Sequence, residues 1–366
     1  MRPIKYFANI NILRGFAALS ILIYHLIDPN KWPEFPNSGL LLWFRYGWIA
    51  VDLFFVISGF VITLSFLQRA KNSVELTEQE GFRKQFLFNR LARIIPLYVL
   101  TCLIYVVFVN PNLIFDHLLK NFFLHLFFLH NLVPEYLFGF NPPSWTLSVE
   151  VQFYLLLSVL GVRLIRANIL YIALFGILVA LLARSINFFE FDHVNYDHLI
   201  KKLANILCYL DEFIVGLILA RFVISPNFKK LTQLTLPKKI CISALLILTI
   251  YFSQIFYIEY VTLDYKIIFY RTILALNCAS IILIFTMIEI KGLTRKLLSP
   301  LYYLGTISYG IYLWHFPVMV SLERLYPIPQ TYFMALCIFV TIIFSSISWH
   351  FFEKPIIEKV RKKALV

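Results

Sequence analysis

Long apolar stretches separated by short polar segments dominate this chain. Ten of them reach the length of about 20 residues that a helix needs to cross a bilayer. They lie near 7–27, 44–66, 91–110, 145–164, 167–184, 204–223, 240–257, 267–290, 301–322 and 331–350. Because backbone polar groups find no water inside a bilayer, such segments are expected to be helices. The pattern therefore predicts an all-α, polytopic integral membrane protein with about ten transmembrane helices.

A shorter apolar run lies in the longest outer connection, 111–144. The run 121–130 is rich in phenylalanine, leucine and histidine, and it is too short to cross a bilayer comfortably. We therefore expect a re-entrant or interfacial helix at this position.

The basic residues are distributed unevenly between the two sets of connections. With the first residue inside, 22 lysines and arginines fall on the cytoplasmic side, and nine, Arg184 and Arg271 among them, fall on the outer side or at outer span ends. Cytoplasmic loops of membrane proteins carry such an excess of lysine and arginine. The distribution predicts ten spans with both termini cytoplasmic. We expect the chain to lie in the cell inner (plasma) membrane.

Composition agrees with this class and excludes others. Charged residues make up 14% of the chain, whereas soluble domains contain about 25%. The net charge of +13 is explained by the cytoplasmic excess, so we expect no nucleic acid partner. The five cysteines and the histidines show no metal-ligand spacing, and we expect neither a metal site nor a bound cofactor. We expect one domain over 1–366, with a retained first span and no appended soluble domain.

The first apolar segment carries a cation and a titratable base on one face. Arg14 and His25 are eleven residues apart. This spacing is close to three helical turns, so both side chains fall on nearly the same stripe, roughly 16 Å apart along the axis. Polar residues inside a membrane are costly to insert and are by default candidates for a functional site. The alternatives are that Arg14 extends to the interface and that His25 is structural.

Three further titratable residues share the outer half of the bilayer with His25. They are Asp52 in the second segment, Glu150 in the fourth and His315 in the ninth. Two carboxylates and two histidines at one depth can form a general acid–base site, although a common depth does not establish contact. Asp52 could instead be only an ion-pair partner.

Arginines gather toward the cytoplasmic side. Arg90 and Arg93 flank the start of the third segment, and Arg14 lies in the inner half of the first. Guanidinium groups that face a cavity bind phosphate oxygens through forked hydrogen bonds. A long molecule with phosphates at one end and a reactive group at the other would match this arrangement. The alternative for Arg90 and Arg93 is a positive-inside anchor.

Several motifs of the chain occur together in one known family. They are Arg14 with His25, then 54–60, 90–98, 143–150 with 153–154, 307–317 and the closing 352–355. In this order and at these spans, they resemble the membrane acyltransferase 3 family, which includes bacterial O-antigen and other polysaccharide O-acetyltransferases. The resemblance covers nearly the whole chain.

The resemblance implies an activity and its partners. The activity is transfer of an acyl group, usually acetyl, from cytoplasmic acyl-CoA to a hydroxyl on an extracytoplasmic or lipid-linked glycan, such as lipopolysaccharide. Membrane lipid, acyl-CoA (acetyl-CoA by family habit) and a saccharide acceptor would be the partners. The resemblance also implies that Arg14, His25 and the Glu150 motif are essential.

A mechanism follows as a hypothesis. Arg14, Arg90 and Arg93 bind the phosphates of acyl-CoA, and His25 takes the proton of the attacking hydroxyl. Glu150 holds the imidazole tautomer and stabilises the imidazolium. Supporting or acceptor-binding roles are expected for Asp52, Ser58, Trp145, Tyr154, Tyr312 and His315. The small residues at 58–59 are also typical of close helix packing. Direct transfer and a route through an acyl-enzyme both remain open.

Two other classes of protein remain as alternatives. Buried charges in many spans suit a polytopic transporter of a lipid-linked sugar or small acid, although the chain shows no half-chain symmetry. Glycosyltransferases that use lipid-linked sugars pair acidic residues in the first outer loop, where this chain has Asp28 and Glu34. Release of CoA that depends on a glycan would distinguish acyl transfer from both.

Overall fold

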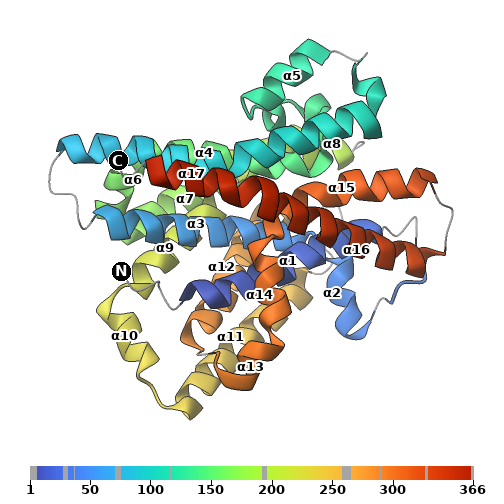
Figure 1. Cartoon of the computed structure of the whole chain (residues 1–366). Helices are drawn as coiled ribbons and strands as arrows, with labels where there is room; N and C mark the ends of the chain where they lie inside the picture. Colours follow the sequence, from blue (N-terminus) through green and yellow to red (C-terminus); the bar gives the residue numbers. More distant parts are fainter. Residues whose placement is uncertain are drawn as a thin grey trace. The chain divides into compact units, whose positions relative to one another are not determined.

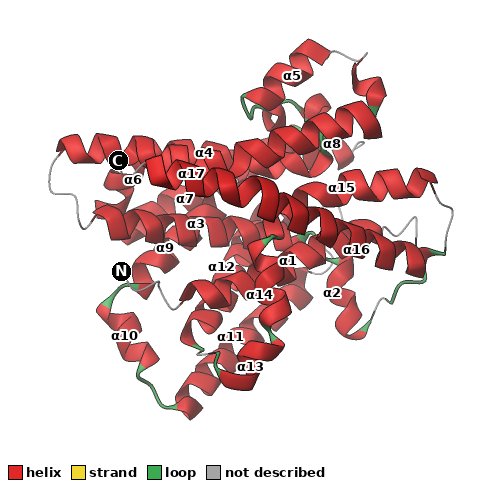
Figure 2. Ribbon diagram, in the orientation of Figure 1, coloured by secondary structure: helices red, strands yellow, loops and turns green. Residues whose placement is uncertain are grey.

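The computed structural model describes residues 6–27, 32–36, 38–70, 76–114, 118–191, 196–257, 265–288, 290–325 and 329–363. Within these ranges the chain consists of helices and connecting loops, without strands (Figure 2). The all-α fold class that the apolar pattern predicts is therefore confirmed. Asp28, named above for the glycosyltransferase alternative, lies outside the described residues.

The chain divides into two compact units, each assembled from segments far apart in sequence. The first unit contains the residues up to Ile10, Asp52–Lys84 and Gln152–Lys291. The second unit contains Asn11–Val51, Gln85–Val151 and the residues from Gly292 onward.

The helices are labelled in Figure 1 and are grouped here by unit. Those wholly in the first unit are α7 (Ile169–Phe189), α8 (Tyr196–Leu203), α9 (Leu210–Val223), α10 (Pro226–Thr232), α11 (Leu236–Tyr257) and α12 (Lys266–Met287). Those wholly in the second are α2 (Leu42–Arg45), α5 (Leu118–Leu126), α13 (Gly292–Leu297), α14 (Ser299–Thr306), α15 (Ser308–Leu325), α16 (Gln330–Ser348) and α17 (Lys354–Lys363). Helices with residues in both units are α1 (Tyr6–Leu26), α3 (Ile49–Ala70), α4 (Leu76–Ile104) and α6 (Trp145–Arg166).

In the described ranges, fewer helices meet the length and composition needed to cross a membrane than the ten segments of the apolar pattern. Seven helical segments in the described ranges are long and apolar enough to cross a membrane. They are Asn9–Leu26, Ile49–Leu67, Arg83–Val109, Pro142–Gly161, Ile169–Phe189, Lys266–Met287 and Gln330–Val360. An eighth would be formed by α10 and α11, which are bent by 111° at a short break.

In the two remaining predicted spans, the regular helix is short or interrupted. In 204–223 the regular helix α9 has only 14 residues, which covers roughly 21 Å. In 301–322 the helix is interrupted between α14 and α15 at Ile307. A membrane location is thus supported by several apolar helices, whereas the count of ten and the orientation of the termini stay predictions.

Close packing of α3 on α9 organises the first unit. A Cβ atom at Gly59 of α3 would overlap the backbone of Phe213 in α9, and one at Gly216 of α9 would overlap the backbone of α3. Phe213 also packs on Phe55 and Phe153, with ring centroids at 5.0 and 4.1 Å. The small residues therefore let the backbones of α3 and α9 approach each other closely. Eleven of the 14 residues of α9 are buried.

The outer connection 111–144 contains the short helix α5 rather than a span. Asn121 and His125 on one face of α5 are buried, whereas Leu119, Phe122 and Phe123 are exposed. This division into a polar buried face and an apolar exposed face agrees with an interfacial helix. The membrane position of α5 stays a prediction.

Candidate active site

Arg14 is positioned by a close contact between α1 and α14 in the second unit. A Cβ atom at Gly15 would overlap a carbonyl group of α14, and one at Gly305 would overlap a carbonyl group of α1. This approach brings Ser308, the first residue of α15, beside α1. The Ser308 hydroxyl donates a hydrogen bond of 3.0 Å to the Gly305 carbonyl and accepts one of 3.0 Å from the Arg14 guanidinium. The guanidinium is therefore oriented although Arg14 is only half-buried.

His25 and His315 meet near the other end of α1. Nδ1 of His25 lies 3.2 Å from Nε2 of His315, and the two rings stack with centroids 5.0 Å apart. His315 is 1% exposed, whereas His25 is half-buried. Each Nδ1 also contacts a carbonyl of its own helix, Ile21 at 3.0 Å for His25 and Ile311 at 3.2 Å for His315. Two of the four titratable residues expected at one depth are thus direct neighbours.

The start of α6 packs against the same part of α15. The Tyr312 hydroxyl donates to the Pro143 carbonyl at 3.0 Å and accepts from the Thr146 hydroxyl at 2.9 Å. The Tyr312 ring lies 5.9 Å from the His315 ring, and Glu150, one helical turn after Thr146, interacts electrostatically with Tyr312. Tyr312 therefore links the region of Glu150 to the histidine pair.

Two further histidines hold the segment before α6. The rings of His125 and His130 stack with centroids 3.8 Å apart. Nδ1 of His130 lies 3.1 Å from the Ser148 hydroxyl, and its Nε2 lies 3.4 Å from the Ser144 hydroxyl. Because Ser148 is two residues before Glu150, this contact fixes the stretch of helix that carries the carboxylate. In the sequence, the only sign of this contact is the presence of two histidines in the aromatic run 121–130.

Burial keeps these two histidines neutral. Desolvation lowers the pKa of His125 to about 4. Desolvation, with the neighbouring His125 as a second cause, lowers the pKa of His130 well below its ordinary value. The hydrogen bond from the Phe140 amide to Nε2 of His125 at 3.2 Å also requires a bare nitrogen there.

Arg90 and Arg93 lie on α4, also in the second unit. The Arg90 guanidinium is 5.7 Å from the centroid of the Phe86 ring, and Arg93 interacts electrostatically with Glu353. Both arginines are half-buried.

One hydrogen bond relates α4 to the Arg14 region. The Tyr309 hydroxyl donates to the Ile94 carbonyl at 2.6 Å. Ile94 follows Arg93, and Tyr309 follows Ser308, the hydrogen-bond partner of Arg14. This hydrogen bond therefore connects α4, which carries Arg93, to the start of α15, where Ser308 binds Arg14.

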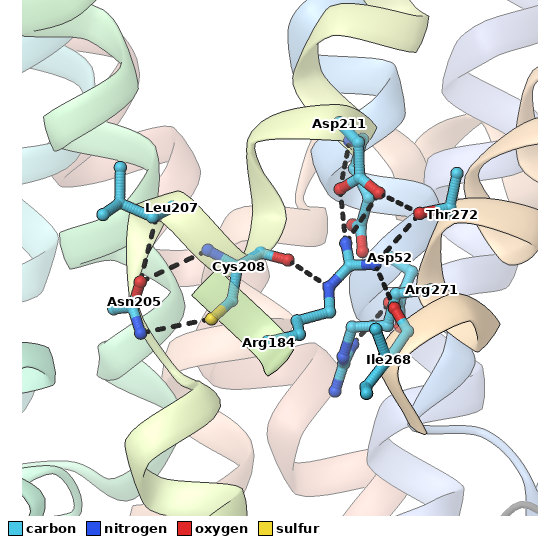
Figure 3. Close-up of polar contacts among 10 residues, drawn as sticks. Asp52, Arg184, Asn205, Leu207, Cys208, Asp211, Ile268, Arg271 and Thr272 are labelled. Atoms are coloured by element: carbon cyan, nitrogen blue, oxygen red, sulfur yellow. Dashed lines mark hydrogen bonds and ion pairs between the residues drawn. The ribbon is translucent and has the colours of Figure 1, made fainter. Parts of the chain in front are cut away.

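Asp52 belongs to the first unit, where it forms an ion pair. Its Oδ1 lies 2.5 Å from Nη1 of Arg271, and both side chains are at most 9% exposed (Figure 3). The Arg271 guanidinium also lies 4.5 Å from the centroid of the Tyr209 ring. This contact favours the alternative in which Asp52 is an ion-pair partner.

A second buried ion pair lies next to the first. Arg184 and Asp211 are both 0% exposed, and Nη2 of Arg184 lies 2.5 and 2.6 Å from the two carboxylate oxygens. The Cys208 carbonyl accepts from Nε of Arg184 at 2.9 Å, and the Thr272 hydroxyl donates to Asp211 at 2.5 Å (Figure 3). The carboxylate and guanidinium thus have several hydrogen bonds in addition to each other.

This network corrects one interpretation of the charges. The sequence pattern places Arg184 and Arg271 at outer span ends, but both are buried and paired with aspartates. They do not belong in a count of loop charges. An acidic pair at 211–212 inside an apolar segment was the signal that could have indicated buried partners.

The remaining predicted site residues are divided between the units. Trp145, half-buried at the start of α6, is in the second unit, whereas Ser58 and the buried Tyr154 are in the first. Ser58 is half-buried and precedes Gly59, which packs on α9. In the described ranges, no group of three or more histidine, cysteine or acidic residues is arranged to hold a metal ion.

Comparison with known proteins agrees with this arrangement of motifs. A family model described as an acyltransferase domain, acyltransferase 3, matches residues 7–350. YrhL of Bacillus subtilis, provisionally named a peptidoglycan O-acetyltransferase, is 29% identical over 96% of this chain and 55% of its own length. The peptidoglycan O-acetyltransferase OatA of Listeria monocytogenes is 27% identical over 96% of this chain and 56% of its own. The O-acetyltransferase OatA of Staphylococcus aureus is 27% identical over 97% and 58%.

These relatives are longer than this chain. The chain spans a little over half the length of these relatives, 55–58%. No solved structure matches the chain. The family model nevertheless covers nearly all of it, so the chain belongs to the acyltransferase 3 family.

Proposed function

We propose that this chain is a membrane O-acetyltransferase domain that moves an acetyl group from cytoplasmic acyl-CoA to a hydroxyl of an extracytoplasmic glycan. Membership of the acyltransferase family supports acyl transfer. The names of the relatives favour peptidoglycan over O-antigen or lipopolysaccharide as the acceptor. We also propose that residues 1–366 act as one functional domain in the plasma membrane.

The contact between His25 and His315 is the observation that carries this proposal. It holds an imidazole in a half-buried position on the helix that also carries Arg14. Neutral imidazole is the side chain best suited to accept a proton near pH 7. His25 takes the proton of the glycan hydroxyl while its oxygen attacks the thioester carbonyl carbon. The carbon–sulfur bond then breaks, and the imidazolium returns the proton to the leaving thiolate, giving an acetyl ester and free CoA.

The donor is proposed to lie along α1. CoA has phosphates at one end and the thioester at the other, and α1 is one continuous helix from Tyr6 to Leu26. Arg14 and His25 are therefore separated by roughly 16 Å along the axis. Arg14 would bind phosphate oxygens, together with Arg90 and Arg93 on α4.

Glu150 is proposed to act on the charged form of the imidazole. A carboxylate stabilises the imidazolium that forms when the hydroxyl loses its proton. Its electrostatic interaction with Tyr312, which neighbours His315, supports a position close to the reaction. Tyr312 and Trp145 are proposed to shape the acceptor side, while Asp52, Ser58 and Tyr154 support the fold from the first unit.

The test uses the full chain in proteoliposomes, with acetyl-labelled acetyl-CoA and soluble peptidoglycan fragments. The wild-type protein is expected to release CoA and to form an ester only when both substrates are present. His25→Gln is expected to lower kcat by about 100-fold or more, because general base catalysis contributes that factor. Arg14→Gln is expected to raise KM for acetyl-CoA by about tenfold.

A matched control comes from His350, which is exposed and lies outside the site. His350→Gln is expected to retain wild-type transfer. Near-normal transfer by His25→Gln would contradict the assigned base. Absence of glycan-dependent CoA release by the wild-type protein would contradict acyl transfer and favour the transporter alternative.

A further inference from the structure

His315 is the residue of α15 that contacts the proposed base directly. Its ring is 1% exposed, and it contacts the rings of His25, Tyr312 and Phe316. Burial of a polar ring is costly unless its nitrogens have partners. Both nitrogens of His315 have one, namely the Ile311 carbonyl and Nδ1 of His25.

The partners determine where the protons lie. A carbonyl oxygen only accepts hydrogen bonds, so Nδ1 of His315 and Nδ1 of His25 each carry a proton toward the carbonyls at 3.2 and 3.0 Å. If Nε2 of His315 were protonated as well, two N–H groups would face each other at 3.2 Å. Nε2 of His315 must therefore be a bare nitrogen that accepts a second, shared hydrogen bond from Nδ1 of His25.

This arrangement has a consequence for His25. In the neutral form of an imidazole, a proton on one nitrogen leaves the lone pair on the other. With its proton held on Nδ1 by the Ile21 carbonyl and by His315, neutral His25 carries its basic lone pair on Nε2. The nitrogen that takes the substrate proton is thus defined by the Ile21 carbonyl together with a residue on another helix.

We propose that neutral His315 is a positioning residue that fixes the tautomer of His25 and makes Nε2 the reactive nitrogen. The inference rests on the proposed function for its catalytic meaning, but the tautomer itself does not depend on it. A neutral histidine here takes the orienting role that a carboxylate has in many hydrolases and that the sequence assigns to Glu150, while Glu150 keeps the role of stabilising the imidazolium. A neutral partner aligns the ring without adding a charge to the buried site.

Two substitutions of nearly equal size separate this role from simple packing. His315→Gln places an amide oxygen where Nε2 lies, so it can still accept from His25. His315→Asn places its amide near Nδ1, so it can bond its own helix but cannot reach His25. We expect Asn to lower kcat by about 10- to 100-fold, as loss of an orienting partner does, with KM for acetyl-CoA unchanged. Gln is expected to restore kcat to within about threefold of wild type.

The outcomes that overturn the proposal are equally defined. Wild-type kcat in His315→Asn would show that the contact is not needed. Equal losses in the Asn and Gln variants, with thermal unfolding of both close to wild type, would show that the hydrogen bond to His25 is not what matters.

Solid-state NMR of ¹⁵N-histidine-labelled protein tests the tautomer without any substrate. It is measured above the ordinary histidine pKa of about 6.5, and the His25 signals are assigned by their loss in His25→Gln. We expect a protonated Nδ1 and a bare Nε2 in the wild-type protein and a mixture of tautomers in His315→Asn. Any other state of His25 in the wild type overturns the inference. Failure of acetyl transfer would instead overturn the proposed function and leave this measurement unaffected.

Discussion

The two units treat their buried polar groups in opposite ways. In the first unit, the buried aspartates Asp52 and Asp211 are each paired with an arginine at 2.5 Å. In the second unit, the buried polar rings are histidines that contact serines, carbonyls or one another. These two aspartates are thus neutralised by arginines in the first unit, while neutral histidines lie together in the second.

Buried ion pairs and buried histidines suit different roles. Removing one partner of a buried ion pair leaves an uncompensated charge, so substitution of either partner lowers the stability of the fold. Histidine can gain and lose a proton near neutral pH, so a histidine pair suits proton transfer. We infer that the first unit supports the fold and that the second carries the chemistry.

The largest expected effect is loss of an ion pair in the first unit. Arg184→Met leaves Asp211 buried without its cation and is expected to lower the free energy of unfolding by about 3–5 kcal/mol. Denaturant unfolding in detergent micelles measures this change. The double variant Arg184→Met/Asp211→Leu is the control, and it should recover most of the loss. A single variant as stable as wild type would contradict the structural role of the pair.

A smaller effect is expected from pH acting on the neutral histidines of the second unit. The pKa of His125 is about 4 in the folded protein, below its value of about 6.5 in an unfolded chain. The unfolded chain therefore binds more protons between these values, so stability falls as the pH is lowered through this window, by up to about 3 kcal/mol. His125→Gln should flatten the dependence, as measured by thermal unfolding from neutral to acidic pH. An unchanged slope in that variant would exclude His125 as the cause.

The smallest effect is expected from Glu212 in the first unit. Glu212 is 0% exposed, and its carboxyl group lies within hydrogen-bond reach of Asp52. A neutral amide of the same shape can also donate a hydrogen bond to Asp52, so Glu212→Gln is expected to change stability by less than about 1 kcal/mol. The same unfolding measurement checks it against Asp211→Asn, which should cost more because it weakens the pair with Arg184. A large loss of stability in Glu212→Gln would mean that the carboxyl group itself stabilises the network.

Local patterns in the chain were enough to predict the class of the protein and the single helix that carries Arg14 and His25. Seven predicted spans coincide with long apolar helices, because membrane helices are recognised by length and apolarity, which are local properties. Arg14 and His25 lie on one continuous helix, α1, and the period of a helix places residues eleven apart on nearly the same face. The family motifs are likewise continuous in sequence, and the family model matches residues 7–350, which contain all of them except 352–355.

Contacts between distant segments could be decided only by the folded chain. His25 and His315 are 290 residues apart, and Asp52 and Arg271 are 219 apart. A common depth places such residues in one layer, but helix packing determines which of them meet. That packing depends on close approaches such as those at Gly15 and Gly305, where a single added carbon would separate two helices. Local periodicity specifies the face of a helix, whereas its neighbour is chosen by the shapes of all the helices together.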